Sequence, residues 1–117
     1  MRYLRLFAVT IAVMLMASGC QGAYDKEAFD DDAIIIDVRN LEEFNSGHIP
    51  GALILPLPQL AEEIAHLVPD LDQPIILYCR SGNRSNQALD ILTSMGYTNV
   101  HDMGGIYNWT GEIVTNP

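Results

Sequence analysis

One stretch determines the fold: Ile75-Ile76-Leu77-Tyr78-Cys79-Arg80-Ser81-Gly82-Asn83-Arg84-Ser85. An apolar run ends at Cys79, and five polar or small residues separate it from Ser85. An apolar run of this length, flanked by turn-forming residues, predicts a buried parallel strand. Beyond Ser85, apolar residues at the spacing i, i+3, i+4, i+7 predict a helix: Ala88, Ile91, Leu92 and Met95. The sequence therefore places Cys79 on a tight turn between a strand and a helix, whose N-terminus points at the sulfur.

The predicted surroundings of Cys79 favour a thiolate. The first turn of a helix has backbone N–H groups without partners and a partial positive charge, and it stabilises an anion. Arg80 and Arg84 flank the same turn. Gly82 permits backbone angles that other residues avoid, and Ser81, Asn83 and Ser85 suit turns, so the loop can form a cradle of N–H donors. We therefore interpret Cys79 as a reactive cysteine and not as a buried structural one.

This loop resembles the active-site loop of single-domain rhodaneses, a family of thiosulfate sulfurtransferases and related persulfide enzymes. Two further motifs resemble the first and last signatures of that family. The first is Asp37-Val38-Arg39 followed by Glu43-Phe44 and Gly47-His48-Ile49-Pro50-Gly51-Ala52, and the last is Gly104-Gly105-Ile106-Tyr107-Asn108-Trp109. The resemblance covers residues 24–112, and within the family it is to the small exported rhodaneses of bacterial phage-shock operons. Three ordered motifs are a much more specific signal than one.

The resemblance implies sulfur transfer through a covalent intermediate. The Cys79 thiolate takes the outer sulfur of thiosulfate or a similar anionic donor, and the resulting persulfide passes it to a thiol or a cyanide-like acceptor. The expected substrate-binding residues are Arg80, Ser81, Gly82, Asn83, Arg84 and Ser85, with the two arginines on the donor's sulfonate oxygens. No metal or organic cofactor is expected, because the histidines and cysteines lack metal-ligand spacing.

Asp37 and Arg39 follow the first predicted strand, and we interpret them as a structural pair that braces its end. The resemblance adds that Asp37 supports the active site from below and that Arg39 approaches the substrate. His48 is tempting as a general base, but we interpret it as a turn histidine bonded to the backbone. Asn40 and Glu43 fit a helix N-cap and its capping box. Trp109 is expected in the core or as a lid.

Two alternatives to a sulfurtransferase remain. A cysteine phosphatase has five residues between its cysteine and arginine, whereas Cys79 and Arg84 enclose four. The shorter loop makes a smaller cradle, which suits one sulfur atom better than a phosphate. A non-catalytic persulfide carrier or interaction module also remains possible, because a fold does not determine function.

The N-terminal residues predict export and a membrane anchor. Arg2 and Arg5 precede an apolar run over 6–16, which is too short for a membrane span, and small residues follow. We therefore expect a signal peptide over 1–19. Ala17-Ser18-Gly19-Cys20 resembles a bacterial lipobox, although Ala17 stands where Leu is more usual, so cleavage is expected to leave a lipid on Cys20. The expected location is the periplasm, with the chain anchored to a cell-envelope membrane through that lipid.

Length and charge limit the remaining possibilities. The 117 residues suggest one domain, and we assign 20–32 to a tether and 33–117 to the rhodanese domain. The net charge of -9 becomes -11 when Arg2 and Arg5 leave with the signal peptide. Such a charge excludes a general nucleic-acid binder, so no nucleic-acid partner is expected. An anionic substrate must be captured locally, and the acidic surface serves solubility.

Strands and helices alternate along the domain. Strands are predicted at 33–36, 52–55, 75–79 and 99–103, with helices or helical turns between them. This alternation predicts an α/β fold with a central, mostly parallel sheet and helices on both faces. The resemblance implies the three-layer sandwich of the rhodaneses. Ligands of such sheets bind beyond the carboxyl ends of the strands, where Cys79 is expected.

Overall fold

The computed structural model describes residues 24–116. The predicted signal peptide over 1–19 and the predicted lipid on Cys20 lie outside the described residues, and so does the first part of the predicted tether. Within the described range, no helix has the length and apolar character needed to cross a bilayer.

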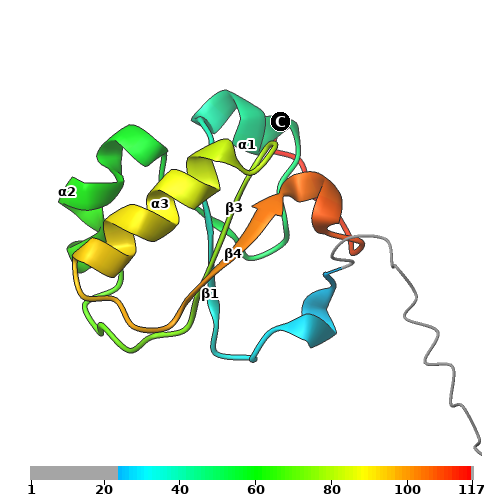
Figure 1. Cartoon of the computed structure of the whole chain (residues 1–117). Coiled ribbons are helices and arrows are strands. Elements are labelled where there is room, and N and C mark those ends of the chain that lie inside the picture. The colour runs from blue at the N-terminus through cyan, green and yellow to red at the C-terminus, as the bar shows by residue number, and fades with distance from the viewer. Residues whose placement is uncertain (1–23, 117) are drawn as a thin grey trace, which may run out of the picture.

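The core of the molecule is a four-stranded sheet in the order β2-β1-β3-β4, with every pair parallel. Its strands are β1 (Ile34–Asp37), β2 (Leu53–Ile54), β3 (Ile75–Cys79) and β4 (Val100–Gly105). The helices are α1 (Leu41–Ser46), α2 (Leu57–Leu67) and α3 (Asn83–Ser94), with short 3-10 turns η1 (Lys26–Ala28) and η2 (Ile106–Asn108). Figure 1 shows the strands crossing the middle of the molecule between these elements. The predicted α/β fold with a parallel sheet is confirmed.

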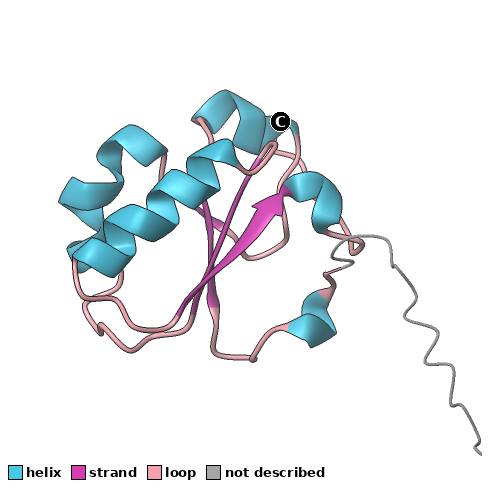
Figure 2. Ribbon diagram, viewed as in Figure 1, coloured by secondary structure: helices cyan, strands magenta, loops and turns pink. Residues whose placement is uncertain are grey.

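Each face of the sheet has its own hydrophobic cluster. Side chains of a strand alternate between faces, so Ile36 and Leu77 lie on one face while Ile76 and Tyr78 lie on the other. Residues of α2 and α3 cover the first face, and α1 with the segments around η1 and η2 covers the second. The helices on both sides of the strands are visible in Figure 2. All five residues of β3 are buried, as expected for a central strand covered twice.

The chain breaks its elements at glycine and proline. Pro56 precedes α2 and Pro58 lies in its first turn, where a missing N–H costs nothing. Helix α3 begins at Asn83, three residues before its predicted start after Ser85, so Arg84 and Ser85 belong to its first turn. The predicted strand at 52–55 shortens to two paired residues, and the last strand extends through Gly105.

The described part of the predicted tether, residues 24–32, lies against the domain. Tyr24 pairs with the chain around Trp109: its N–H donates to Asn108 O at 2.8 Å, and its carbonyl accepts the Thr110 N–H at 2.8 Å. Phe29 stacks on Trp109 with ring centroids 6.3 Å apart. Tyr24 and Phe29 therefore pack against the hydrophobic cluster on the second face of the sheet.

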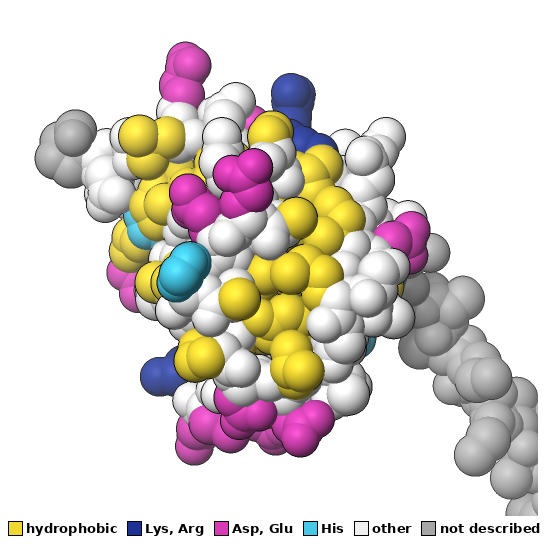
Figure 3. Space-filling model, turned by 90° about the vertical axis from the view of Figure 1, so that its left-hand side faces the viewer, with side chains coloured by type: hydrophobic (Ala, Val, Ile, Leu, Met, Phe, Trp, Pro, Cys, Tyr) yellow, Lys and Arg dark blue, Asp and Glu magenta, His cyan; other side chains and the backbone are white. Residues whose placement is uncertain are grey.

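Figure 3 views the side of the molecule on which α2 and α3 lie in Figure 1, and hydrophobic side chains gather over it. Leu67 in α2 and Met95 just after α3 are among the exposed large hydrophobic residues. The carboxyl ends of the strands lie at a different edge, beside α1 and the beginning of α3 (Figure 1). That edge holds Cys79 at the end of β3 and the loop that leads to α3.

Candidate active site

Cys79 ends β3, and the loop after it folds back over its sulfur. The Gly82 N–H donates to Sγ at 3.0 Å, and Ser85 Oγ lies 3.5 Å from Sγ, within hydrogen-bond distance for sulfur. The cysteine is 1% exposed, but its sulfur faces these polar groups and is not enclosed by hydrocarbon alone. The predicted position of Cys79, on a tight strand-to-helix turn, is confirmed.

The loop depends on the backbone conformation of Gly82. Its φ of 101° lies in the left-handed region, which other residues rarely adopt. Gly82 is also the N-cap of α3 and provides no side chain to cap it. The N–H groups of the first turn are therefore left for another acceptor, and the Cys79 sulfur lies next to them.

A second glycine lets β4 approach the loop. A Cβ on Gly105 would lie 2.7 Å from the carbonyl oxygen of Arg80 and would also collide with the Tyr107 ring. Gly105 pairs with Cys79 in the sheet, so the absence of a side chain brings the two strands' ends together beneath the loop. Gly105 belongs to the last of the three sequence motifs, and the close approach of Arg80 O explains why this position has no side chain.

The surroundings lower the pKa of the Cys79 thiol. Burial raises this pKa, but the Ser85 hydroxyl and the backbone N–H groups of Ser85, Gly82 and Ser81 lower it by more. Ser85 is fully buried, and its hydroxyl also contacts Gly82 O at 3.2 Å. Hydrogen-bond donors of the loop thus stabilise the thiolate, as the predicted N–H cradle requires.

The two loop arginines differ in their surroundings. Arg80 is exposed and has no carboxylate within ion-pair distance among residues 24–116. Arg84 forms a two-pronged ion pair with Glu43, at 2.6 Å from Nη1 to Oε1 and 2.9 Å from Nη2 to Oε2. Of the other loop residues, Ser81 and Asn83 are exposed, and Asn83 Oδ1 accepts a bond from Gln87 at 2.8 Å.

Glu43 is the residue that sequence analysis missed in this role. The capping box with Asn40 is confirmed: the Glu43 N–H donates to Asn40 Oδ1 at 2.8 Å and the Asn40 N–H to Glu43 Oε1 at 3.3 Å. The bond from Arg84 lowers the pKa of Glu43 to about 2, against the opposing effect of burial. The pairing follows from the sheet order, in which β1 and β3 are neighbours, and the sequence analysis predicted no strand order.

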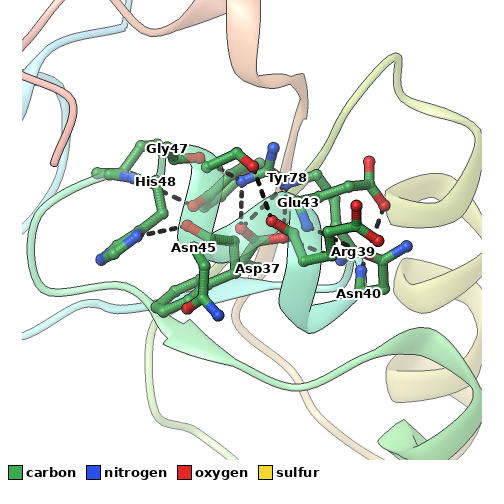
Figure 4. A network of polar contacts seen from close by, with 12 residues as sticks. Asp37, Arg39, Asn40, Glu43, Asn45, Gly47, His48 and Tyr78 are labelled. Atoms are coloured by element: carbon green, nitrogen blue, oxygen red, sulfur yellow. Dashed lines mark hydrogen bonds and ion pairs between the residues drawn. The ribbon is translucent and has the colours of Figure 1, made fainter. Parts of the chain in front are cut away.

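Beneath the loop, Asp37 and Arg39 form the predicted brace. Arg39 Nη2 lies 2.7 Å from Asp37 Oδ2, both side chains are buried, and the same nitrogen donates to Gly47 O at 2.7 Å. The Arg39 guanidinium also lies over the ring of Tyr78, 5.5 Å from its centroid. Figure 4 shows this network with Glu43 and Asn40 beside it.

His48 and Trp109 pack within the fold and lie among structural contacts. His48 is buried, its Nδ1 lies 2.8 Å from Phe44 O, and its ring stacks on Phe44, which confirms a turn histidine (Figure 4). Trp109 packs against the hydrophobic cluster on the second face of the sheet. Of the two expected positions, core or lid, it therefore occupies the core. Among residues 24–116, no three His, Cys, Asp or Glu side chains gather in a way that would hold a metal ion.

A cleft of about 350 Å³ borders the loop through Arg84. Arg39, Asn40 and Gln59 also line it, so its walls come from the ends of β1 and from the beginnings of α2 and α3. This is the edge of a parallel sheet at which ligands bind.

Comparison with known proteins gives a consistent picture. The model of the rhodanese-like domain family matches residues 22–112. The thiosulfate sulfurtransferase PspE of Escherichia coli K12 is 44% identical over 71 residues, which are 61% of this chain and 68% of that protein. The thiosulfate sulfurtransferase GlpE of Pseudomonas savastanoi is 35% identical over 81 residues, covering 68% and 74% of the two chains. A solved structure described as a rhodanese with anions from E. coli aligns with a TM-score of 0.68 at 38% identity, over 71% of this chain and 98% of the other.

Proposed function

The chain belongs to the rhodanese-like family and is an enzyme of the sulfurtransferase type, and from that premise we propose that it moves the outer sulfur of thiosulfate, or of a similar donor, to a thiophilic acceptor. The nucleophile in this proposal is Cys79. The observation that carries it is the contact between Cys79 Sγ and the Gly82 N–H at the uncapped beginning of α3.

The first step is attack by the Cys79 thiolate on the outer sulfur of thiosulfate. A new S–S bond forms, the S–S bond of thiosulfate breaks, and sulfite leaves with the electron pair. The product is a persulfide anion on Cys79. The N–H groups that lower the pKa of the thiol are in position to stabilise this anion as well.

In the second step, the acceptor attacks the outer sulfur of the persulfide. With cyanide, a carbon–sulfur bond forms, the persulfide S–S bond breaks, and the thiolate of Cys79 is restored as thiocyanate leaves. No proton transfer to a base is needed in either step when the thiol is already ionised. His48 is therefore not needed as a base, which agrees with its bond to Phe44 O and its stacking on the Phe44 ring.

The loop arginines bind the oxygen atoms of the donor. Arg80 is exposed and has no ion-pair partner within residues 24–116, so its charge is available to the donor. A guanidinium has about five N–H donors, and Glu43 uses two of those of Arg84, so others remain for the donor. Ser81, Gly82, Asn83 and Ser85 shape the loop, while Asp37 and Arg39 hold the strand end beneath it.

The test is production of thiocyanate from thiosulfate and cyanide by the full chain. We expect multiple turnovers in the unmodified protein and in Cys20→Ser, and none in Cys79→Ser. Full activity in Cys79→Ser would exclude the mechanism. A gain of about 32 Da on Cys79, one sulfur atom, without turnover would instead indicate a persulfide carrier. Release of phosphate from an aryl phosphate would indicate a phosphatase.

We also propose that the chain is exported to the periplasm and anchored there by lipid on Cys20. The support is the order of basic residues, apolar run and small residues before Cys20. Labelled palmitate should enter the chain in a bacterial host and should be absent from Cys20→Ser. Incorporation in both proteins, or in neither, would contradict the proposal.

A further inference from the structure

The ion pair between Glu43 and Arg84 holds one arginine of the loop that follows Cys79. Arg84 lies in the first turn of α3, five positions after Cys79, and Glu43 lies in the first turn of α1. The two side chains are 33% and 24% exposed, so solvent screens their charges only in part. A carboxylate is thus bound to an arginine of a loop that is expected to receive anions.

We propose that Glu43 determines the charge selectivity of the site, because its carboxylate offsets the charge of Arg84 and leaves Arg80 as the loop arginine with a free charge. Arg84 keeps hydrogen-bond donors for a substrate, but its attraction for a second negative charge is reduced. The site is then less favourable for highly charged anions than two free arginines would make it.

Geometry favours this role over a purely structural one. Glu43 meets Arg84 with both carboxylate oxygens at 2.6 and 2.9 Å, whereas its capping bond to the Asn40 N–H uses Oε1 alone and is longer, at 3.3 Å. Arg84 is also within electrostatic reach of Cys79, since the thiolate raises the pKa of Arg84 after the larger effect of Glu43. A change in the balance of this pair must therefore alter the potential at the sulfur.

Alkylation of Cys79 tests this potential without requiring sulfur transfer. The measured quantity is the ratio of the rates with iodoacetate, an anion, and iodoacetamide, which is neutral, followed by mass spectrometry of the Cys79 peptide. A changed thiol pKa affects both reagents equally and cancels in the ratio. A changed local charge affects only the anion.

Two single variants and the double variant remove the charges of the pair one at a time and together. Glu43→Gln keeps an oxygen for Asn40 and Arg84 but frees the positive charge, so the ratio should rise about three- to tenfold at low salt. Arg84→Gln leaves the carboxylate unbalanced, so the ratio should fall. The double variant should return close to the unmodified protein, and about 0.5 M salt should reduce both shifts.

Glu42→Gln is the matched control, because Glu42 is the exposed neighbour of Glu43 with no ion-pair partner among residues 24–116. It removes the same charge from the same helix and should change the ratio less than twofold. A purely structural pair would shift both single variants in one direction, and that result would overturn the proposal. So would an unchanged or lower ratio in Glu43→Gln.

The consequence for substrates rests on the proposed function. Glu43→Gln should raise kcat/KM for thiosulfate several-fold at low salt, through KM. If the unmodified protein makes no thiocyanate, the proposed function fails, while the alkylation ratio still decides the role of Glu43. If Glu43→Gln does not fold, the proposal is still tested by Arg84→Gln, in which the ratio of the iodoacetate rate to the iodoacetamide rate should decrease.

Discussion

At the scale of single residues, hydrogen bonds and not formal charges stabilise the Cys79 thiolate. The groups that lower the pKa of the thiol most are the Ser85 hydroxyl and three backbone N–H groups. The sequence also predicts a contribution from Arg80 and Arg84, but the charge of Arg84 is offset by Glu43, and Arg80 is exposed to solvent. Short-range donors resist screening by water and salt better than exposed charges do.

Ser85→Ala should therefore raise the pKa of Cys79. The lost hydroxyl leaves the thiolate with backbone donors only, so the thiol form gains and alkylation by iodoacetamide at pH 7 should slow by about threefold to tenfold. The pH dependence of that rate is the measurement, and its midpoint should move upward.

Ser81→Ala provides the control for this prediction. Ser81 acts on the sulfur through its backbone N–H, which alanine retains. Its rate profile should overlay that of the unmodified protein. A profile for Ser85→Ala that does the same would show that the hydroxyl has no effect on the thiolate.

The sequence predicted Cys79 and Gly82 because their signals are local: an apolar run that stops, and a glycine in a turn. The burial of Ser85 was not predictable in this way, since its hydroxyl lies 3.5 Å from the carbonyl of Gly104, nineteen residues away. The pairing of Glu43 with Arg84 spans 41 residues. Both depend on how neighbouring strands align, which no pattern along the chain records.

At the scale of elements, the candidate active site is formed where strands end and helices begin. β1 leads to α1 and β3 leads to α3, and the two strands are neighbours in the sheet. The first turns of the two helices consequently meet, which brings Glu43 to Arg84 and the free N–H groups of α3 to Cys79. A parallel sheet produces this convergence as a matter of topology.

Gly105→Ala tests the close approach of β4 to the loop. The added methyl would lie 2.7 Å from the backbone oxygen of Arg80, so the loop must move away from Cys79. We expect thiocyanate production to fall at least about tenfold, and the free energy of unfolding to fall by about 1–3 kcal/mol.

Gly51→Ala is the comparison for that variant. Its φ of 82° strains alanine, yet no atom outside the neighbouring residues lies within 4 Å of the new methyl. It should lose about 1–2 kcal/mol of stability and keep its turnover number. If Gly105→Ala and Gly51→Ala lose equal activity, the loss in Gly105→Ala comes from lower stability and not from a displaced loop.

Element types were easier to predict than their ends. The helix after Cys79 was expected to begin after Ser85, because Ser81, Asn83 and Ser85 all suit turns. It begins at Asn83, since Gly82 ends the turn in a left-handed conformation and acts as the N-cap without a side chain. A cap of this kind leaves little trace in sequence, while the Asn40 cap of α1 was visible from its partner Glu43.

At the scale of the whole molecule, the chain is strongly negative and has few positively charged side chains. The net charge is -9, and the described residues contain four Lys or Arg: Lys26, Arg39, Arg80 and Arg84. Two of these, Arg39 and Arg84, are paired with carboxylates. Attraction of an anion therefore depends on the loop itself, against the repulsion of the surface as a whole.

The pH dependence of folding should report the Glu43–Arg84 pair. In the folded state the pKa of Glu43 is about 2, against an ordinary value of 4.5. A carboxyl group with a lowered pKa stabilises the fold above its unfolded value and loses that effect as the pH falls. The stability added by Glu43 should thus be complete above pH 4.5 and decline toward pH 2. Because both side chains are partly exposed, we expect about 1 kcal/mol.

Urea unfolding of the unmodified protein and of Glu43→Gln across this range is the measurement. The difference in unfolding free energy between them should be constant above pH 4.5 and should shrink steadily below it, because the variant has no group to protonate there. Glu42→Gln should follow the unmodified protein throughout, since that side chain lacks an ion-pair partner within residues 24–116. A difference that stays constant down to pH 2 would mean that the ion pair adds nothing to folding, and that Glu43 acts on stability only through its cap with Asn40.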